Sequence, residues 1–175
     1  MNLDWLKSRI DKTTDVASAL REAAPEICKR FSCDRLTIYR ATEDGASLVA
    51  VVQMGLESFG AVKVRVDSGR SVAGHVGALR KLVNIADAYD EKELAPLQMK
   101  MRMFRAVDER TGYTTRQVLA APIVSASKGK LLGVVELFNR TDKERFPSTA
   151  EDGIVALCAF LALVFAKEAS KTTAA

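Results

Sequence analysis

The chain has 175 residues, of which 48% are hydrophobic and 27% are charged, and this is the size and balance of one globular domain over 1–175. A domain of this length buries about 70% of the surface of its unfolded chain, so it needs no metal or disulfide framework to fold. The formal net charge of +4 is a mild excess and not the dense basic stripe of nucleic-acid binders. We therefore expect no nucleic-acid partner.

The cysteines and the N-terminus bear on the cellular compartment. Cys28, Cys33 and Cys158 are odd in number and lack the spacing of a zinc site, which favours a reducing environment. Residues 1–5 lack the charged and apolar regions of a signal peptide. We expect a cytoplasmic protein.

An amphipathic helical segment is predicted over 1–31, because apolar residues recur there at helical spacing with charges between them. Pro25 lies inside this pattern and lacks an amide donor. The segment should therefore kink, or divide into two helices near Thr13 or Pro25.

A second helix is predicted over 149–170. Ser148 and Glu151 have the spacing of a capping box at its start. The run 153–166 is apolar on nearly every face, yet its fourteen residues fall short of the roughly 20 that cross a bilayer. Such a helix needs neighbours on more than one side. We expect one face to cover the domain and another to meet a second copy in a homodimer, with no membrane contact.

The middle of the chain, 32–148, has the alternation of strands. Six are predicted, at 35–40, 48–53, 61–66, 82–85, 118–124 and 130–138, with the first two and the last two forming hairpins. Ser71 can cap a short helix that runs to Arg80. These elements indicate an α+β fold with a six-stranded, mainly antiparallel sheet. The terminal helices should lie on one face, and short helices with a lid segment from 86–115 should cover a pocket on the other.

Several segments together resemble a GAF domain. They are NIADAY at 84–89, residues 104–116, VLAAPI at 118–123, GVVELFNR at 133–140, and SVAGHV at 71–76. The likeness extends from about residue 31 to 166 and is nearest to the GAF domains of cyclic-nucleotide phosphodiesterases and bacterial cyclases. It implies a bacterial regulatory module without catalysis that encloses a purine nucleotide or another small molecule and requires no cofactor.

The resemblance also assigns pocket residues. The ligand-binding set it implies is Thr37, Val72, Ala73, Phe104, Thr111, Thr115 and Glu136. The two threonines of 111–115 would donate to a cyclic phosphate or ribose, and the helix start at 72–73 is chemically suited to anions. The alternative is that the threonines satisfy nearby backbone groups and that the glutamate faces water.

Two departures from the family pattern limit what the resemblance implies. Met54 stands where related domains carry an acidic residue that reads the base, so guanine discrimination should fall and adenine or another small molecule is left open. In the pocket-support motif Asn139, Phe146 and Glu151 match, but Arg140 replaces a lysine. This chain has Ala150 at the position where the family has the aspartate that pairs with that lysine, so the family's salt bridge cannot form. Either Glu151 or Asp152 substitutes, or these residues only cap the last helix.

The sequence gives less support to a catalytic triad or a metal site. His75 is the single histidine, so no catalytic triad or multi-histidine metal site can be assembled, and a structural role is expected. Met99, Met101 and Met103 could bind copper, but pocket or core lining is favoured.

Two functional alternatives remain beside the sensor. One is a dimerisation or docking module of a larger signalling or secretion ATPase. The other is a free methionine sulfoxide reductase, which the cysteine positions do not favour, because none lies in 86–115. We expect no enzyme.

Overall fold

The computed structural model describes residues 1–57, 60–67, 69–97, 102–127 and 129–173, and the side chains of 102–106 and 171–173 are not among the described parts. Its centre is a curled six-stranded sheet of order β3-β2-β1-β6-β5-β4, in which every neighbouring pair is antiparallel. The strands are β1 (Cys33–Ala41), β2 (Ser47–Gln53), β3 (Lys63–Arg65), β4 (Val83–Ile85), β5 (Val118–Val124) and β6 (Leu131–Arg140). The predicted α+β class and its six strands are confirmed.

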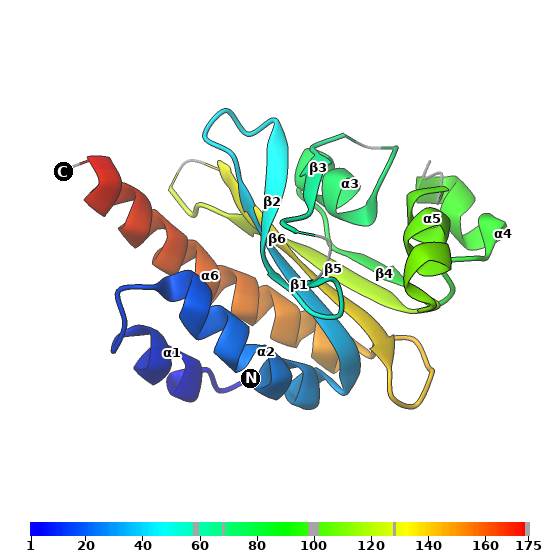
Figure 1. Ribbon diagram of the computed structural model, residues 1–175, viewed down its shortest axis with the longest axis horizontal. Coiled ribbons are helices and arrows are strands. Elements are labelled where there is room, and N and C mark those ends of the chain that lie inside the picture. The colour runs from blue at the N-terminus through cyan, green and yellow to red at the C-terminus, as the bar shows by residue number, and fades with distance from the viewer. Residues whose placement is uncertain (58–59, 68, 98–101, 128, 174–175) are drawn as a thin grey trace.

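The terminal helices cover one face of the sheet (Figure 1). They are α1 (Asp4–Ile10), α2 (Val16–Phe31) and α6 (Ser148–Thr173). The break falls between α1 and α2, where Asp15 accepts from the Ser18 amide at 2.9 Å and caps α2. Pro25 lies within α2 without ending it. Of the two predicted break points, the one near Thr13 is therefore right.

The main apolar core fills the space between these helices and the sheet. Its fully buried members include Leu20, Ile27, Leu36, Ile38, Leu137, Leu157 and Leu161. Because side chains alternate along a strand, the neighbours of these strand residues point to the other face. That face carries a second, smaller apolar cluster and the candidate site.

The second face is roofed by short helices, which Figure 1 shows on the side of the sheet away from α6. They are α3 (Val72–Leu79), α4 (Glu91–Leu94), the 3-10 turn η2 (Ala95–Leu97) and α5 (Arg102–Thr111). Ser71 caps α3 as predicted, its hydroxyl accepting from the Gly74 amide at 3.0 Å. Met99 and Met101 lie outside the described residues, as does the side chain of Met103, so their predicted lining role is untested.

Helix α6 is longer than its apolar run suggested, with 26 residues. Among the described residues it is the one helix whose length and composition would suit a membrane span, and 44% of that stretch is buried within the domain. Its inner residues Ile154, Leu157 and Leu161 are fully buried, whereas Val155 and Leu163 are exposed. The helix therefore has an apolar outer face that this single chain leaves uncovered.

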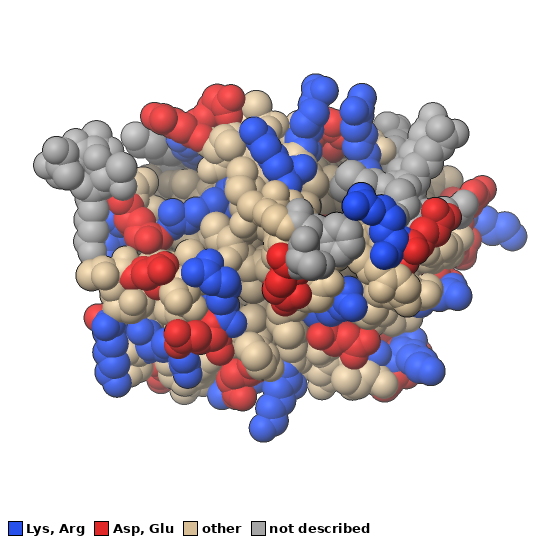
Figure 2. Space-filling view, in the orientation of Figure 1, with Lys and Arg blue, Asp and Glu red and all other residues tan. Residues whose placement is uncertain are grey.

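The outer surface mixes both signs of charge. Figure 2 shows Lys and Arg side chains interspersed with Asp and Glu over the face in view. On this face the charges form no basic stripe, in keeping with the small net charge of +4.

Candidate functional site

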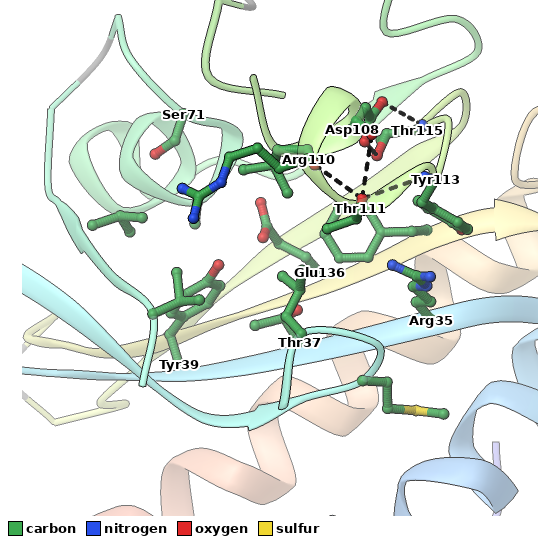
Figure 3. A pocket seen from close by; sticks show the side chains of 17 residues that line it. Arg35, Thr37, Tyr39, Ser71, Asp108, Arg110, Thr111, Tyr113, Thr115 and Glu136 are labelled. Carbon is green, nitrogen blue, oxygen red and sulfur yellow. Dashed lines mark hydrogen bonds between the residues drawn. The ribbon is translucent and has the colours of Figure 1, made fainter. Parts of the chain in front are cut away.

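A cavity of about 300 Å³ lies between the sheet and the roof formed by α3 and α5. Strands β1 and β6 form its floor, β3 and the segment between β2 and β3 form one wall, and residues 107–115 form the opposite wall (Figure 3). Its polar lining consists of Arg35, Thr37, Tyr39, Ser71, Asp108, Arg110, Thr111, Tyr113, Thr115 and Glu136. This volume lies at the small end of the range for ligand sites in proteins.

Glu136 is the acidic group on the cavity floor. It is 2% exposed and lies opposite Thr37 in the β1–β6 register. Burial raises the pKa of Glu136 to about 7, and the Tyr39 hydroxyl and the Ala73 amide, in the first turn of α3, lower it by a smaller amount. Its Oε1 atom is buried and has no hydrogen-bond partner among the described residues, so the floor offers an open acceptor.

Arg35 supplies a positive charge to the same cavity. Its guanidinium carbon lies 3.6 Å from the centre of the Tyr113 ring, and this stacking holds the side chain in place. Gly55, at φ +76°, passes close by, and a Cβ there would lie 2.5 Å from the guanidinium carbon. Within the described part of the chain, the guanidinium has no carboxylate partner. A ligand anion could therefore take that place.

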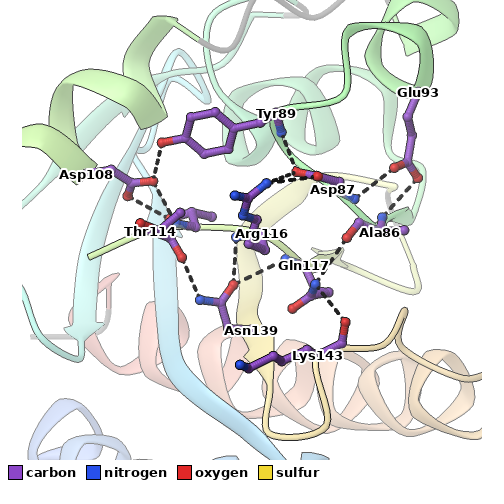
Figure 4. Close-up of polar contacts among 11 residues, drawn as sticks. Ala86, Asp87, Tyr89, Glu93, Asp108, Thr114, Arg116, Gln117, Asn139 and Lys143 are labelled. Atoms are coloured by element: carbon purple, nitrogen blue, oxygen red, sulfur yellow. Dashed lines mark hydrogen bonds and ion pairs between the residues drawn. The ribbon is translucent and has the colours of Figure 1, made fainter. Parts of the chain in front are cut away.

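The lid is held down by one buried carboxylate, that of Asp108 on α5. It accepts from the Tyr89 hydroxyl at 2.8 Å, from the Thr115 amide at 2.6 Å and from the Thr115 hydroxyl at 2.9 Å (Figures 3 and 4). The Thr111 hydroxyl donates to the Val107 carbonyl at 2.9 Å. Both threonine hydroxyls thus donate within the protein. The Thr111 hydroxyl does so to a nearby backbone group, as the local alternative described, whereas the Thr115 hydroxyl donates to a side chain. Both hydroxyls can still offer lone pairs to a ligand.

The structure brings most of the predicted ligand-binding residues together. Those that line the cavity are Thr37, Ala73, Thr111, Thr115 and Glu136. Val72 does not line it, because the first turn of α3 directs its side chain into the second apolar cluster, where it is fully buried. The Phe104 side chain lies outside the described residues. Whether the five lining residues bind a ligand stays a prediction.

Sequence reasoning missed several cavity residues, among them Arg35, Tyr39, Asp108 and Tyr113. The two on β1 had a usable signal. Residues two apart on a strand share a face, so once Thr37 is placed in the pocket its neighbours at 35 and 39 belong there too. No comparable local period marks the lid residues.

Asn139 supports the cavity wall from the end of β6, where it adopts φ +48°. Its Oδ1 accepts from the amides of Arg116 and Gln117 at 2.7 and 3.2 Å, and its Nδ2 donates to the Thr114 carbonyl at 2.8 Å (Figure 4). The side chain therefore fixes the backbone on both sides of Thr115.

The other residues of the pocket-support motif make contacts that differ from those expected. Arg140 pairs with Asp142 rather than with Glu151 or Asp152. The Glu151 carboxylate accepts from Asn84 Nδ2 at 2.6 Å. It thereby ties α6 to β4 and does not form the predicted capping box. Phe146 is 2% exposed and belongs to the main core.

The cysteines and the histidine lie apart from the cavity lining. Cys28, Cys33 and Cys158 are free and buried, and His75 is buried within α3. Among the described residues, no group of three or more His, Cys, Asp or Glu side chains is placed to hold a metal ion. The cavity itself therefore presents no thiol for reductase chemistry.

Comparisons with known proteins agree with this geometry. The model of the GAF domain family matches residues 15–166. The structure resembles the GAF domain of a phosphoenolpyruvate-protein phosphotransferase from Coxiella burnetii, with a TM-score of 0.77, 21% identity, and coverage of 98% of this chain and 94% of that one. It also resembles a free methionine-R-sulfoxide reductase from Neisseria meningitidis, with a TM-score of 0.66, 16% identity, and coverage of 97% and 89%.

Curated relatives are found among phosphodiesterases. The chain is 29% identical over 123 residues to a probable 3',5'-cyclic phosphodiesterase, pde-5, of Caenorhabditis elegans, covering 65% of this chain and 15% of that protein. It is 35% identical over 89 residues to the dual 3',5'-cyclic-AMP and -GMP phosphodiesterase 11 of Drosophila melanogaster, covering 51% and 5%. The chain thus spans a small part of these relatives' length. The family match, which covers most of the chain, shows that it belongs to the GAF domains, which are regulatory and sensory modules that bind small molecules.

Proposed function

We propose that the chain is a sensor domain that binds a small molecule, in the first place a cyclic nucleotide, and signals through the terminal helices of a homodimer. The observation that carries the proposal is that one cavity presents both an acidic acceptor and a positively charged donor. Among the residues that the structure describes, the buried Oε1 of Glu136 has no hydrogen-bond partner and the Arg35 guanidinium has no carboxylate partner.

A nucleotide matches both groups. An exocyclic amine on the base can donate to Glu136, and the cyclic phosphate can accept from the Arg35 guanidinium. The names of the phosphodiesterase relatives support the same ligand class. Met54 lines the cavity where related domains carry an acidic residue that reads guanine, so cyclic GMP should have no strong advantage over cyclic AMP.

The sheet offers a route from the cavity to the helices. Glu136 lies between Val135 and Leu137 on β6, and these two belong to the core beneath α2 and α6. A ligand can shift the helices only by preferring one arrangement of them. The exposed Val155 and Leu163 on the outer face of α6 suit an isologous contact with a second copy.

Calorimetry tests whether the chain binds cyclic AMP or cyclic GMP. Arg35→Ala should weaken cyclic AMP binding by about 10- to 100-fold, the value of a hydrogen bond to a charged group. Arg9→Ala removes an exposed arginine that pairs with Glu22 outside the cavity, and it should bind like the unsubstituted chain. Absence of heat with both nucleotides, or equal loss in the two variants, would refute a cyclic nucleotide at this site.

A dimerisation or docking module without a ligand is the second candidate, and the uncovered apolar face of α6 favours it. Crosslinking at Val155 separates the two candidates. A sensor should change its crosslinking yield when cyclic AMP is added. A docking module should crosslink equally with and without nucleotide.

A further inference from the structure

Three sulfur atoms meet where α2 ends beside the sheet. They belong to Cys28 in the last turns of α2, Cys33 at the start of β1, and Met54 directly after β2. The Cys28 Sγ lies 3.5 Å from the Met54 Sδ. The Ser32 amide donates to the Cys28 carbonyl, which brings Cys33 back beside Cys28. The two thiols interact, and this lowers the pKa of Cys28 and raises that of Cys33. Cys28 therefore lies between the other two sulfur-bearing residues.

The backbone holds this cluster in place. Ser32 adopts the left-handed conformation, φ 52°, which ends α2 and turns the chain so that Cys33 returns beside Cys28. The Met54 amide donates to the Leu36 carbonyl at 3.0 Å, which fixes Met54 against β1. The three sulfurs thus come from three elements that the fold has already joined.

Two thiols and a thioether form a donor set for soft metal ions. Such sulfur ligands favour Cu(I) over ions that prefer oxygen and nitrogen. The two cysteines are only 5% and 6% exposed and lie in the main apolar core. Metal–sulfur bonds of about 2.3 Å in a trigonal site would set the sulfurs about 4 Å apart, close to the separation of Cys28 and Met54.

We propose that Cys28, Cys33 and Met54 bind one soft monovalent metal ion, Cu(I) or its analogue Ag(I). The ion replaces the two S–H protons, which pass to solvent, and forms two thiolate bonds and one thioether bond. No electron is transferred, and the site acquires a net charge of −1.

Met54 provides the access route. Its side chain is half-buried, and it borders both the cavity and an outer groove along β2. An arriving ion can therefore meet the thioether first and then pass to the two buried thiols.

The test is an anaerobic titration of the reduced full chain with Cu(I) in competition with bicinchoninate, repeated with Ag(I). We expect one equivalent per chain. Cys28→Ser and Cys33→Ser should each weaken binding by at least about 100-fold, since loss of outer partners alone costs about 10- to 100-fold. Met54→Leu should weaken it by about tenfold. Cys158→Ser is the matched control, because that buried thiol on α6 lies against the Ala121 carbonyl and should not matter.

X-ray absorption on the unsubstituted chain keeps the test independent of how the variants fold. Three sulfur neighbours at about 2.3 Å would support the site. Nitrogen or oxygen coordination, failure to retain one equivalent, or equal weakening by Cys158→Ser would overturn it.

Discussion

The two faces of the sheet are built from the same strands but have opposite chemistry. On β1, Leu36 and Ile38 face the terminal helices, whereas Arg35, Thr37 and Tyr39 line the cavity. Long helices cover most of the first face and bury its apolar core. Short helices cover the second, and hydrogen bonds through Asp108 and Asn139 hold its roof in place. One face therefore supplies stability, and the other can hold a ligand.

The largest loss in stability should follow from creating a void in the core between the sheet and the terminal helices. Leu137→Ala removes a fully buried side chain of β6 that pairs with Leu36 and Leu119. The loss in free energy of unfolding should be about 2–5 kcal/mol, measured by urea denaturation. On the cavity face, Thr37→Val should cost no more than about 1 kcal/mol, because it removes a hydroxyl that borders the cavity and creates no void in the core. Equal losses in the two variants would contradict the division between the faces.

Glu136→Gln should show how much the charged Glu136 carboxylate lowers the free energy of unfolding. The native pKa of about 7 exceeds the ordinary 4.5, so the folded state holds its proton more tightly than the unfolded chain. The stability that this preference contributes is present below about pH 4.5 and is lost as the pH rises to about 7. Above pH 7 the variant should be the more stable by up to about 3 kcal/mol, and near pH 4 the two should match.

Thermal and urea unfolding at both pH values measure this difference. Tyr39→Phe serves as a control, because it leaves the Glu136 carboxylate in place. The Tyr39 hydroxyl lowers the pKa of Glu136, so its removal should raise that pKa further and enlarge the loss of stability at high pH. A Glu136→Gln variant that is less stable at every pH would mean that the carboxylate supports the fold.

Asp108→Asn should loosen the roof without opening the core. The carboxylate accepts three hydrogen bonds, and an amide can accept on one side only. The expected cost is about 2 kcal/mol, with faster amide hydrogen exchange at 113–117. Exchange in β6 should not change, and acceleration there as well would show that the roof and the sheet open together.

Local periodicity was sufficient to predict most of the fold. Alternation in the middle of the chain located the six strands, and the apolar pattern at each end located the helices. Residues such as Thr37 and Glu136 could be placed in the site by resemblance to the GAF family. The engagement of Thr115 with Asp108 could not be predicted, because it depends on the path of the lid. The stacking of Arg35 on Tyr113 likewise joins segments far apart in sequence, and no local pattern encodes such a contact.

The smallest effect on stability, and a direct test of the dimer, is expected for Leu163→Lys. Leu163 is 71% exposed on the outer face of α6, so the free energy of unfolding of the monomer should change by no more than about 0.5 kcal/mol. A lysine in an isologous contact lies near its own symmetry mate, so dimerisation should weaken by at least about tenfold in sedimentation velocity. Leu79→Lys is the matched control, since Leu79 is 47% exposed at the end of α3 on the other face of the sheet. Equal sedimentation of both variants and the unsubstituted chain would place the contact elsewhere, and α6 would then need another partner to cover its apolar face.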